Sequence, residues 1–134
     1  MSSLSLPMKN LLQTSRFGHR SDPFTGKRRF HYGTDFSASN DKIRSIMPGK
    51  IVDVGYQRKG LGNYVKVQNG DFLVIYGHLR QSIGSIGDLL EAGDIIGISG
   101  STGRSTGEHL HLSVKFRGKH VNPEPILKYI EGML

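Results

Sequence analysis

The fold is decided by residues 63–76, which read NYVKVQNGDFLVIY. Val65 and Val67 alternate with polar neighbours, and a second apolar run follows from Phe72 to Tyr76. The Asn-Gly pair at positions 69 and 70 is the strongest short signal for a tight hairpin turn. This stretch therefore predicts two adjacent antiparallel strands.

The same alternation is present on either side of this hairpin. Residues 50–56 read KIVDVGY, and the glycine-rich segment 59–62 separates them from the strand that follows. Another strand is expected over residues 110–116. Glycines interrupt the apolar runs between residues 83 and 99, which leaves few places for a helix. The chain is therefore expected to be mainly β.

The ends of the chain carry different patterns. Residues 126–130 follow Glu124-Pro125 with a spacing that fits a helix or a strand, and we expect a short closing helix. Near the start, Leu4 and Leu6 alternate as they would in a strand. The Gly, Asp-Pro and Thr-Gly pairs between residues 17 and 27 predict an exposed loop.

The composition indicates one domain. The chain has 134 residues, including 18 glycines and five prolines, which favours many tight turns and a β-rich fold. We find no internal repeat, low-complexity tract or linker. We expect a leader over residues 1–13 and a single domain of antiparallel sheets over residues 14–134.

The net charge of +7 gives the protein a positive potential that attracts polyanions. Residues 27–29 form the only tight basic run, and few aromatic residues lie near it, so a dedicated nucleic-acid reader is not expected. A basic nucleic-acid-associated protein stays open as an alternative. No apolar run approaches the ~20 residues of a membrane span, and residues 4–12 do not resemble a signal peptide.

The histidines suggest a metal site. The chain has no cysteine, so a metal must be bound by His and carboxylate groups. His109 and His111 would project from one face of a strand, roughly 6 to 7 Å apart, although such a pair also occurs on ordinary surfaces. His31 and Asp35 are four positions apart, and Gly33 between them favours a loop or bent strand over a helix. Two histidines and a carboxylate are the ligand set of catalytic zinc sites.

The chain resembles the lysostaphin/LytM-type zinc metalloendopeptidase family from about residue 14 to residue 128. The matching blocks follow one another in family order. They are Ser15-Arg16-Phe17-Gly18, Arg20-Ser21-Asp22-Pro23-Phe24-Thr25-Gly26, His31-x-Gly33-x-Asp35, Gly62-Asn63-Tyr64-Val65, Tyr76-Gly77-His78-Leu79 and residues 100–111, GSTGRSTGEHLH.

The resemblance implies that His31, Asp35 and His111 bind Zn²⁺ at the floor of an open groove. It makes His78 and His109 the catalytic partners. We expect His109 to accept the proton of the attacking water, and His78 to donate a hydrogen bond to the oxyanion or to protonate the leaving amine. An exchange of these two roles stays open.

The resemblance also implies a substrate, the peptide cross-links of bacterial peptidoglycan. Residues 22–26 resemble relatives that cut D-alanyl to diaminopimelate bonds more than those that cut glycine bridges. We expect a monomer acting outside the cytoplasm, delivered by a phage or a secretion system or as part of a larger protein. The residues expected to contact substrate are Arg16, Arg20, Asn63, Arg104 and Ser105.

One alternative comes from the same family. Some relatives have lost zinc ligands and act as wall-binding or amidase-activating modules without catalysis, but no ligand position is substituted here. His19 and His120 have no supporting carboxylate pattern, and we expect them to be structural or surface residues.

Overall fold

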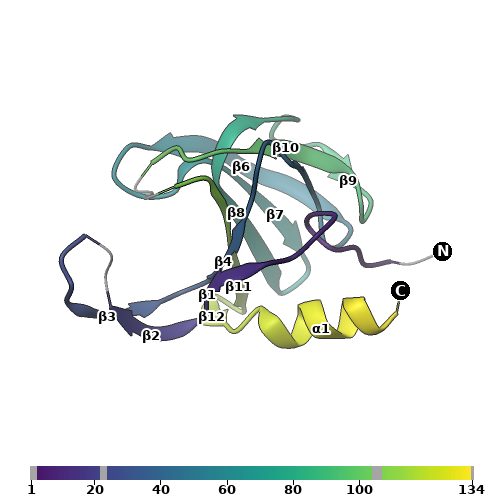
Figure 1. Ribbon diagram of the computed structural model, residues 1–134. Coiled ribbons are helices and arrows are strands. Elements are labelled where there is room, and N and C mark those ends of the chain that lie inside the picture. The colour runs from purple at the N-terminus through teal and green to yellow at the C-terminus, as the bar shows by residue number, and fades with distance from the viewer. Residues whose placement is uncertain (1–2, 22–23, 104–106, 134) are drawn as a thin grey trace.

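The computed structural model describes residues 3–21, 24–103 and 107–133. It consists of strands and one C-terminal helix (Figure 1). In chain order these are β1 (Gln13–Ser15), β2 (Gly18–Ser21), β3 (Arg28–His31), β4 (Thr34–Ser37), β5 (Lys42–Arg44), β6 (Gly49–Gln57), β7 (Gly62–Asn69), β8 (Phe72–Ser82), β9 (Leu89–Leu90), β10 (Ile95–Ser99), β11 (His109–Phe116), β12 (Lys119–Val121) and α1 (Glu124–Gly132).

The larger sheet runs in the order β1-β4-β11-β8-β7-β6-β9. β12 pairs with β11, while β10 pairs with β8 and with β5. Every pairing is antiparallel, although the register shifts at several places. The expected mainly antiparallel β fold is confirmed. β4, β11 and β8 are neighbours in this sheet although they come from distant parts of the sequence.

The hairpin predicted from residues 63–76 is formed by β7 and β8. Asn69 pairs with Phe72, which leaves Gly70 and Asp71 as the two turn residues. Gly70 has a φ of +55°, a conformation that glycine adopts without steric cost. The turn therefore lies one residue later than an Asn-Gly turn would place it.

One hydrophobic core lies beneath the sheet. Val65, Val67 and Val74 from the hairpin are fully buried, as the alternation predicted. Tyr76 is also fully buried, and its hydroxyl accepts a hydrogen bond from the backbone N–H of Ile46 at 2.9 Å. A buried polar group without a hydrogen-bond partner would destabilise the folded protein, and this hydrogen bond prevents that.

The predicted closing helix is confirmed as α1. Pro125 lies in its first turn, where a missing N–H costs nothing, and Asn122 Oδ1 accepts the N–H of Glu124 at 3.0 Å. Leu127 and Ile130, three residues apart, are buried against the core. That apolar stripe fixes the helix on the sheet.

The strand pattern read from Leu4 and Leu6 was wrong. Both residues lie outside any strand and pack, partly buried, against the core. Met8, in the expected leader, is 2% exposed and belongs to the core itself. The boundary after residue 13 stays a prediction.

The loop predicted between residues 17 and 27 was wrong at its start, because β2 pairs there with β3 in a separate two-stranded sheet. We call β2 and β3 the arm. The ring of Phe30 lies 5.1 Å from those of Phe17 and His19, and this cross-strand packing favours pairing over a loop. Figure 1 shows the arm projecting sideways from the larger sheet.

The two ends of the chain lie on the side of the molecule opposite the arm (Figure 1). Among the described residues, no helix has the length and apolarity that a membrane crossing requires.

Candidate metal centre

The pairing of β4 with β11 brings together residues that are far apart in sequence. Asp35 pairs directly with His111, and His111 pairs on its other side with Gly77 of β8. His31 is the last residue of β3 and lies close to both, four positions before Asp35. All three of His31, Asp35 and His111 are largely withdrawn from solvent.

The donor atoms of these three residues converge. His111 Nδ1 lies 2.9 Å from Asp35 Oδ1, His31 Nε2 lies 3.4 Å from Asp35 Oδ2, and the two ring nitrogens are 3.3 Å apart. Ligand atoms around a tetrahedral zinc ion with bonds near 2.0 to 2.1 Å are separated by about 3.3 Å. The three residues therefore fit a zinc ion with little rearrangement.

The tautomers of His31 and His111 are also those that a bound cation requires. His31 Nδ1 donates a hydrogen bond to the backbone carbonyl of Arg16 at 2.9 Å. His111 Nε2 lies 2.8 Å from Ser113 Oγ, to which we assign it as donor. Each ring then directs its other nitrogen, with its lone pair, toward the second ring. Two such lone pairs repel unless a cation lies between them.

Asp35 is charged at any ordinary pH. Burial acts to raise the pKa of its carboxyl, but the interactions with the adjacent polar rings of His111 and His31 outweigh that effect and hold it well below 3.8. The site therefore presents one full negative charge together with two imidazole nitrogens. For His111, burial lowers the pKa of the imidazole, which keeps the ring neutral near pH 7.

A β-bulge in β8 sets the orientation of the His78 side chain. Between the Val65–Tyr76 and Asn63–Leu79 pairs, β8 carries one residue more than β7, and His78 has a φ of +60°. Such a conformation is costly for a residue with a side chain and is over-represented at functional sites. The N–H of His78 donates to the Leu61 carbonyl at 2.6 Å, which helps to hold the bulge.

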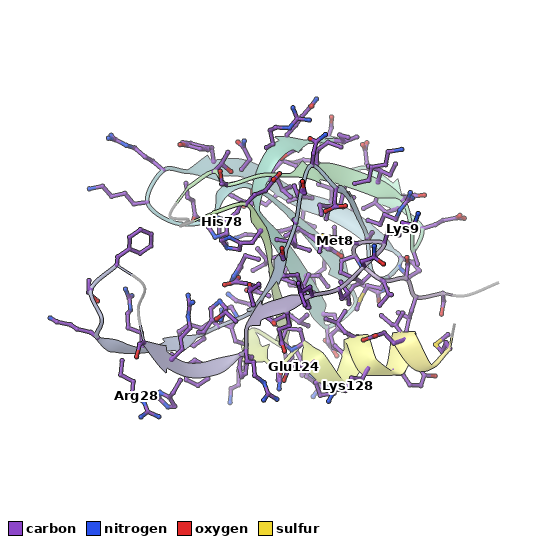
Figure 2. The ribbon with its side chains drawn as sticks, in the orientation of Figure 1. Met8, Lys9, Arg28, His78, Glu124 and Lys128 are labelled. Carbon is purple, nitrogen blue, oxygen red and sulfur yellow. The ribbon has the colours of Figure 1, made fainter. Side chains whose placement is uncertain are left out.

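His78 and His109 face each other beside the three donors. Their ring centroids are 4.7 Å apart, and His109 Nε2 lies 3.8 Å from Asp35 Oδ1. His78 Nδ1 donates to the Thr102 carbonyl at 2.6 Å, and His109 Nδ1 donates to the Gly107 carbonyl at 2.8 Å. Burial lowers the pKa of His78 to about 4, so that ring is neutral near pH 7. Figure 2 shows His78 above the arm.

Gly33 and Ser113 are two residues whose roles the sequence reasoning did not identify. A Cβ at Gly33 would lie 2.7 Å from His111 Cε1 and 2.5 Å from the Leu112 carbonyl oxygen, so only glycine fits there. Ser113 is two residues beyond His111 on the same strand face. The alternation that paired His109 with His111 could therefore have pointed to Ser113.

The residues expected to contact substrate are placed differently. Arg16 directs its side chain to Glu124, with Nε 3.2 Å from Oε1, and only its backbone carbonyl meets the metal centre. Asn63 uses its amide to donate to the carbonyls of Leu79 and Arg80. Arg20 lies on the arm. Arg104 and Ser105 lie outside the described residues. Substrate contact by any of the five stays a prediction.

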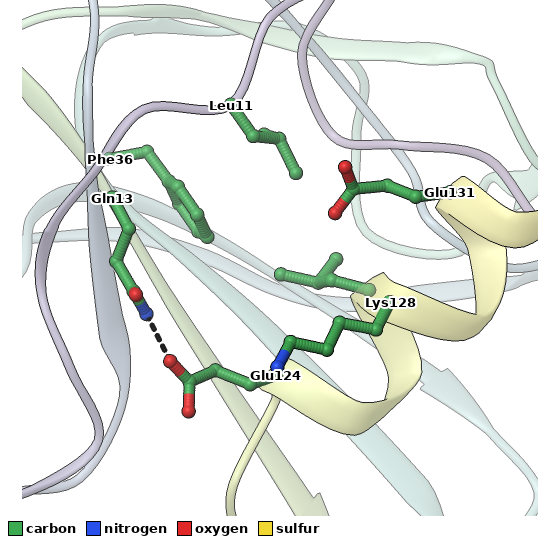
Figure 3. Close-up of a pocket in the computed structure, with 7 residues that line it drawn as sticks. Leu11, Gln13, Phe36, Glu124, Lys128 and Glu131 are labelled. Atoms are coloured by element: carbon green, nitrogen blue, oxygen red, sulfur yellow. Dashed lines mark hydrogen bonds between the residues drawn. The ribbon is translucent and has the colours of Figure 1, made fainter.

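The cavity drawn in Figure 3 is not at this centre. It has a volume of about 120 Å³ and lies between α1, the start of the chain and β4. Phe36, which lines it, follows Asp35 on β4 and so faces the other side of that strand. Gln13 donates to Glu124 at 2.6 Å across its edge (Figure 3).

Residues 29–123, which contain all the histidines of this centre, match the family model described as Peptidase family M23. The chain belongs to peptidase family M23. The resemblance to lysostaphin/LytM-type enzymes is thereby confirmed.

Solved M23-like structures share this fold. The catalytic domain of the antimicrobial peptidase lysostaphin from Staphylococcus simulans is 33% identical and superposes with a TM-score of 0.80, covering 88% of this chain and 92% of that one. A zinc-containing peptidase from Vibrio cholerae is 31% identical with a TM-score of 0.82, covering 90% of this chain and 39% of that one.

Curated relatives of this M23 chain are longer proteins. The DD-carboxypeptidase/endopeptidase Mpg of Neisseria meningitidis is 36% identical over 112 residues, which are 82% of this chain and 26% of Mpg. The chain spans about a fifth to a third of the length of the curated relatives that it matches.

Proposed function

We propose that this chain is a zinc metalloendopeptidase that hydrolyses peptide cross-links of bacterial peptidoglycan, with His31, Asp35 and His111 as the zinc ligands. One observation carries the proposal. A nitrogen of His31, a nitrogen of His111 and the two carboxylate oxygens of Asp35 converge, with separations between residues of 2.9 to 3.4 Å, beside a pair of further imidazoles. The similarity to a zinc-containing peptidase supports the choice of metal.

Zinc, when bound by three protein ligands, supplies a Lewis acid that polarises a carbonyl and makes water a better nucleophile near neutral pH. The protein residues then handle the protons. His109 directs Nε2 toward Asp35 while its Nδ1–H is held by the Gly107 carbonyl. In that tautomer Nε2 accepts the proton of the attacking water and later returns it to the leaving amine.

For His78 the structure supports a narrower role than the sequence suggested. With Nδ1–H donated to Thr102, the neutral ring presents Nε2 as an acceptor only. Donation to an oxyanion would require the protonated ring, and burial, by lowering the pKa of His78 to about 4, disfavours that form near pH 7. We assign His78 to accepting a hydrogen bond from the attacking water and so orienting it.

We propose the D-alanyl to diaminopimelate bond as the one that is cleaved. The similarity to Mpg, named a DD-carboxypeptidase/endopeptidase, supports it. The sequence of residues 22–26 also supports it, because it resembles relatives that cut this bond, although residues 22 and 23 lie outside the described residues. Lysostaphin is similar to about the same degree, so cleavage of glycine bridges is the competing outcome. Because peptidoglycan lies outside the cytoplasm, we also propose extracytoplasmic action, and as a monomer.

The test uses purified sacculi of two kinds, one with direct D-alanyl to diaminopimelate cross-links and one with glycine bridges. Zinc-loaded protein should release peptides from the first kind, identified by mass spectrometry, and a chelator should stop the release. His109→Ala should reduce the rate by about 100-fold or more because it removes the proton acceptor.

Tyr129→Ala is the control, because Tyr129 is an exposed ring on α1 and not on the arm or on the strands that carry the metal centre. It should keep full activity. If folded, zinc-loaded protein releases no peptide from either kind of sacculus, the enzymatic proposal fails and a wall-binding or amidase-activating role replaces it. Release from glycine-bridged sacculi alone would overturn only the choice of bond.

A further inference from the structure

Thr102 contacts His78 and the hairpin that carries it through two different groups. Thr102 lies outside any strand, and its backbone carbonyl accepts the hydrogen bond from His78 Nδ1 at 2.6 Å. Its hydroxyl donates to the carbonyl of Leu79, the residue after His78 on β8, at 2.6 Å. The same hydroxyl accepts the N–H of Asn63 on β7 at 3.0 Å. One residue therefore holds the His78 ring and both strands beside it.

The Thr102 hydroxyl acts as a bridge within the strand ladder. Asn63 and Leu79 are the paired residues that end the bulge, and the hydroxyl links the N–H of the first to the carbonyl of the second. The Asn63 amide adds to this junction by donating to the carbonyls of Leu79 and Arg80 at 3.1 and 3.2 Å. A bulge disrupts the ladder locally, and these contacts satisfy the backbone groups next to it.

The backbone around Thr102 is packed directly against the start of β7. Gly62 and Gly103 have φ values of +64° and +76°. A Cβ at Gly62 would overlap the carbonyl carbon of Thr102, and a Cβ at Gly103 would overlap the backbone nitrogen of Gly62. Only glycine allows two backbones to approach so closely. The Thr102 carbonyl therefore has a fixed place relative to β7 and to the ring that it contacts.

We propose that Thr102 is a positioning residue for His78. Its hydroxyl completes the ladder beside the bulge, and its carbonyl holds the His78 ring in the tautomer with the proton on Nδ1. The inference rests on the proposed function, in which Nε2 of that tautomer accepts a hydrogen bond from the attacking water. The nitrogen of an imidazole that carries the proton is set by the hydrogen bonds of the ring.

Loss of the hydroxyl should release both the bulge and the ring. The φ of +60° at His78 is costly, and such a conformation persists only where the surrounding structure holds it. Without the hydroxyl, the N–H of Asn63 loses its acceptor and the carbonyl of Leu79 loses one of its donors. The Thr102 carbonyl should then no longer select one tautomer of His78.

The test compares Thr102→Val, which keeps the shape of the side chain but removes the hydroxyl, with Thr102→Ser, which keeps the hydroxyl. NMR of zinc-loaded protein with isotope-labelled histidine rings distinguishes a protonated ring nitrogen from an unprotonated one. The signals of His78 are those that disappear in His78→Gln. The unmodified protein and Thr102→Ser should show His78 with its proton on Nδ1 alone. Thr102→Val should show a mixture of both tautomers.

The rate of hydrolysis gives a second readout. Thr102→Val should lower kcat for a cross-linked stem peptide by about 10- to 100-fold, because a small displacement of a group beside the reacting atoms is costly. KM should change little, as expected for a contact that matters in the transition state and not in substrate binding. Thr102→Ser should restore most of the rate.

Ser45→Ala is the matched control. Ser45 is buried, and its hydroxyl also donates to a backbone carbonyl, that of Met47 at 2.7 Å, in the segment between β5 and β6. The change should lower the Tm, yet leave the His78 tautomer and kcat as they are in the unmodified protein. Thermal unfolding shows whether each variant is folded. If Thr102→Val does not fold, Thr102→Ala replaces it, since it removes the hydroxyl and adds no bulk.

The positioning role is overturned if the variant without the hydroxyl keeps a single His78 tautomer, if Thr102→Ser loses it, or if Ser45→Ala disturbs it equally. A failure of the proposed function is a different result. Protein that releases nothing from sacculi, but loses the single tautomer only when the Thr102 hydroxyl is removed, would support the positioning role and contradict the enzyme. Active protein whose His78 signals ignore that removal would support the enzyme and contradict the positioning role.

Discussion

The larger sheet and the arm meet at the metal centre but are built differently. In the sheet, Asp35 and His111 lie on strands that have a hydrogen-bonded neighbour on each side, above a fully buried core. In the arm, two short strands pair only with each other, and every residue of β3 before His31 is exposed. His31 belongs to both regions. It is the last residue of β3 in the arm, and its Nε2 lies beside Asp35 and His111 of the larger sheet.

The difference separates two requirements. A metal site needs donor atoms held to within a few tenths of an ångström, which buried, doubly paired strands provide. A surface that receives a long substrate needs exposed side chains, and such segments have low local stability. The comparison therefore predicts that damage to the sheet affects metal binding and the whole fold, while damage to the arm stays local.

The largest effect is expected for His111→Ala. The change removes one of three donors and leaves buried Asp35 without its shortest partner. Zinc content, measured by atomic emission after dialysis, should fall from one ion per chain to nearly none, and hydrolysis should be lost with it. His19→Ala on the arm should keep its zinc. One tightly bound zinc per chain in His111→Ala would remove His111 from the ligand set.

Ser113→Ala tests whether the sheet also fixes the orientation of the ligands. The change removes the hydrogen-bond partner of His111 Nε2, so zinc affinity should fall by about 10- to 100-fold in a competition assay with a chelating dye. Ser99→Ala is the control. Ser99 is likewise buried, and its Oγ accepts the N–H of Asp41 away from the site. Equal losses of affinity in both variants would contradict a positioning role for Ser113.

Tyr76→Phe tests the core beneath the sheet. It leaves the buried N–H of Ile46 without an acceptor, which should lower the free energy of unfolding by about 1 to 3 kcal/mol in urea titrations at pH 8. Zinc affinity should change little, because the hydroxyl lies in the core and not beside the donor atoms.

The same variant has a pH signature. Burial raises the pKa of Tyr76 to about 12, so the folded protein keeps this proton where the unfolded chain, with a pKa near 10, loses it. The stability that this tyrosine contributes is complete below pH 10 and is lost as the pH rises toward 12. The difference in free energy of unfolding between the unmodified protein and Tyr76→Phe should therefore become smaller above pH 10. A gap that stays constant to pH 11.5 would contradict this account.

The smallest global effect is expected for Phe30→Ala. Phe30 is 38% exposed and packs against the rings of Phe17, His19 and Tyr32, so the free energy of unfolding should fall by less than about 1 kcal/mol. Hydrogen exchange should nevertheless speed up selectively in residues 18–21 and 28–31. Tyr129→Ala, at an exposed aromatic residue of α1, should leave the arm protected. Loss of protection across the whole sheet in Phe30→Ala would show that the two regions unfold together.

Local signals in the sequence were enough for the centre of the sheet. The alternation around Val65 and Val67 and the Asn-Gly turn signal depend on neighbours within a few residues. The predicted strands and their hairpin are present, although the turn lies one residue later than predicted. The extension of β8 to Ser82 was missed because it passes through Gly77 and the bulge at His78. A β-bulge is defined by the pairing with a neighbouring strand, and the local sequence pattern carries no information about that pairing.

The arm was missed for a related reason. Its turn residues are typical of a loop. β2 and β3 are instead held by the rings of Phe17, Phe30 and Tyr32, and Tyr32 packs against His120, which is 88 residues further along the chain. Contacts over that separation leave no periodic signal in a short window.

The candidate site was predicted as a set of residues but not as a geometry. Spacing in the sequence indicated that His31 could lie near Asp35 and that His109 could lie near His111. It could not indicate the contact between His31 and His111, because these residues are 80 positions apart. The pairing of β4 with β11 creates that contact. The family resemblance anticipated it, since the order of the motif blocks carries information about the fold that spacing lacks.

The position of the two chain ends has a practical consequence. Because both lie on the side opposite the arm (Figure 1), a targeting module or an affinity tag fused at either end would leave the approach to His78 and the arm open. Ends on one side of a fold also favour circular permutation and insertion into a host protein. Modules fused at these ends can therefore be exchanged without covering the candidate metal centre.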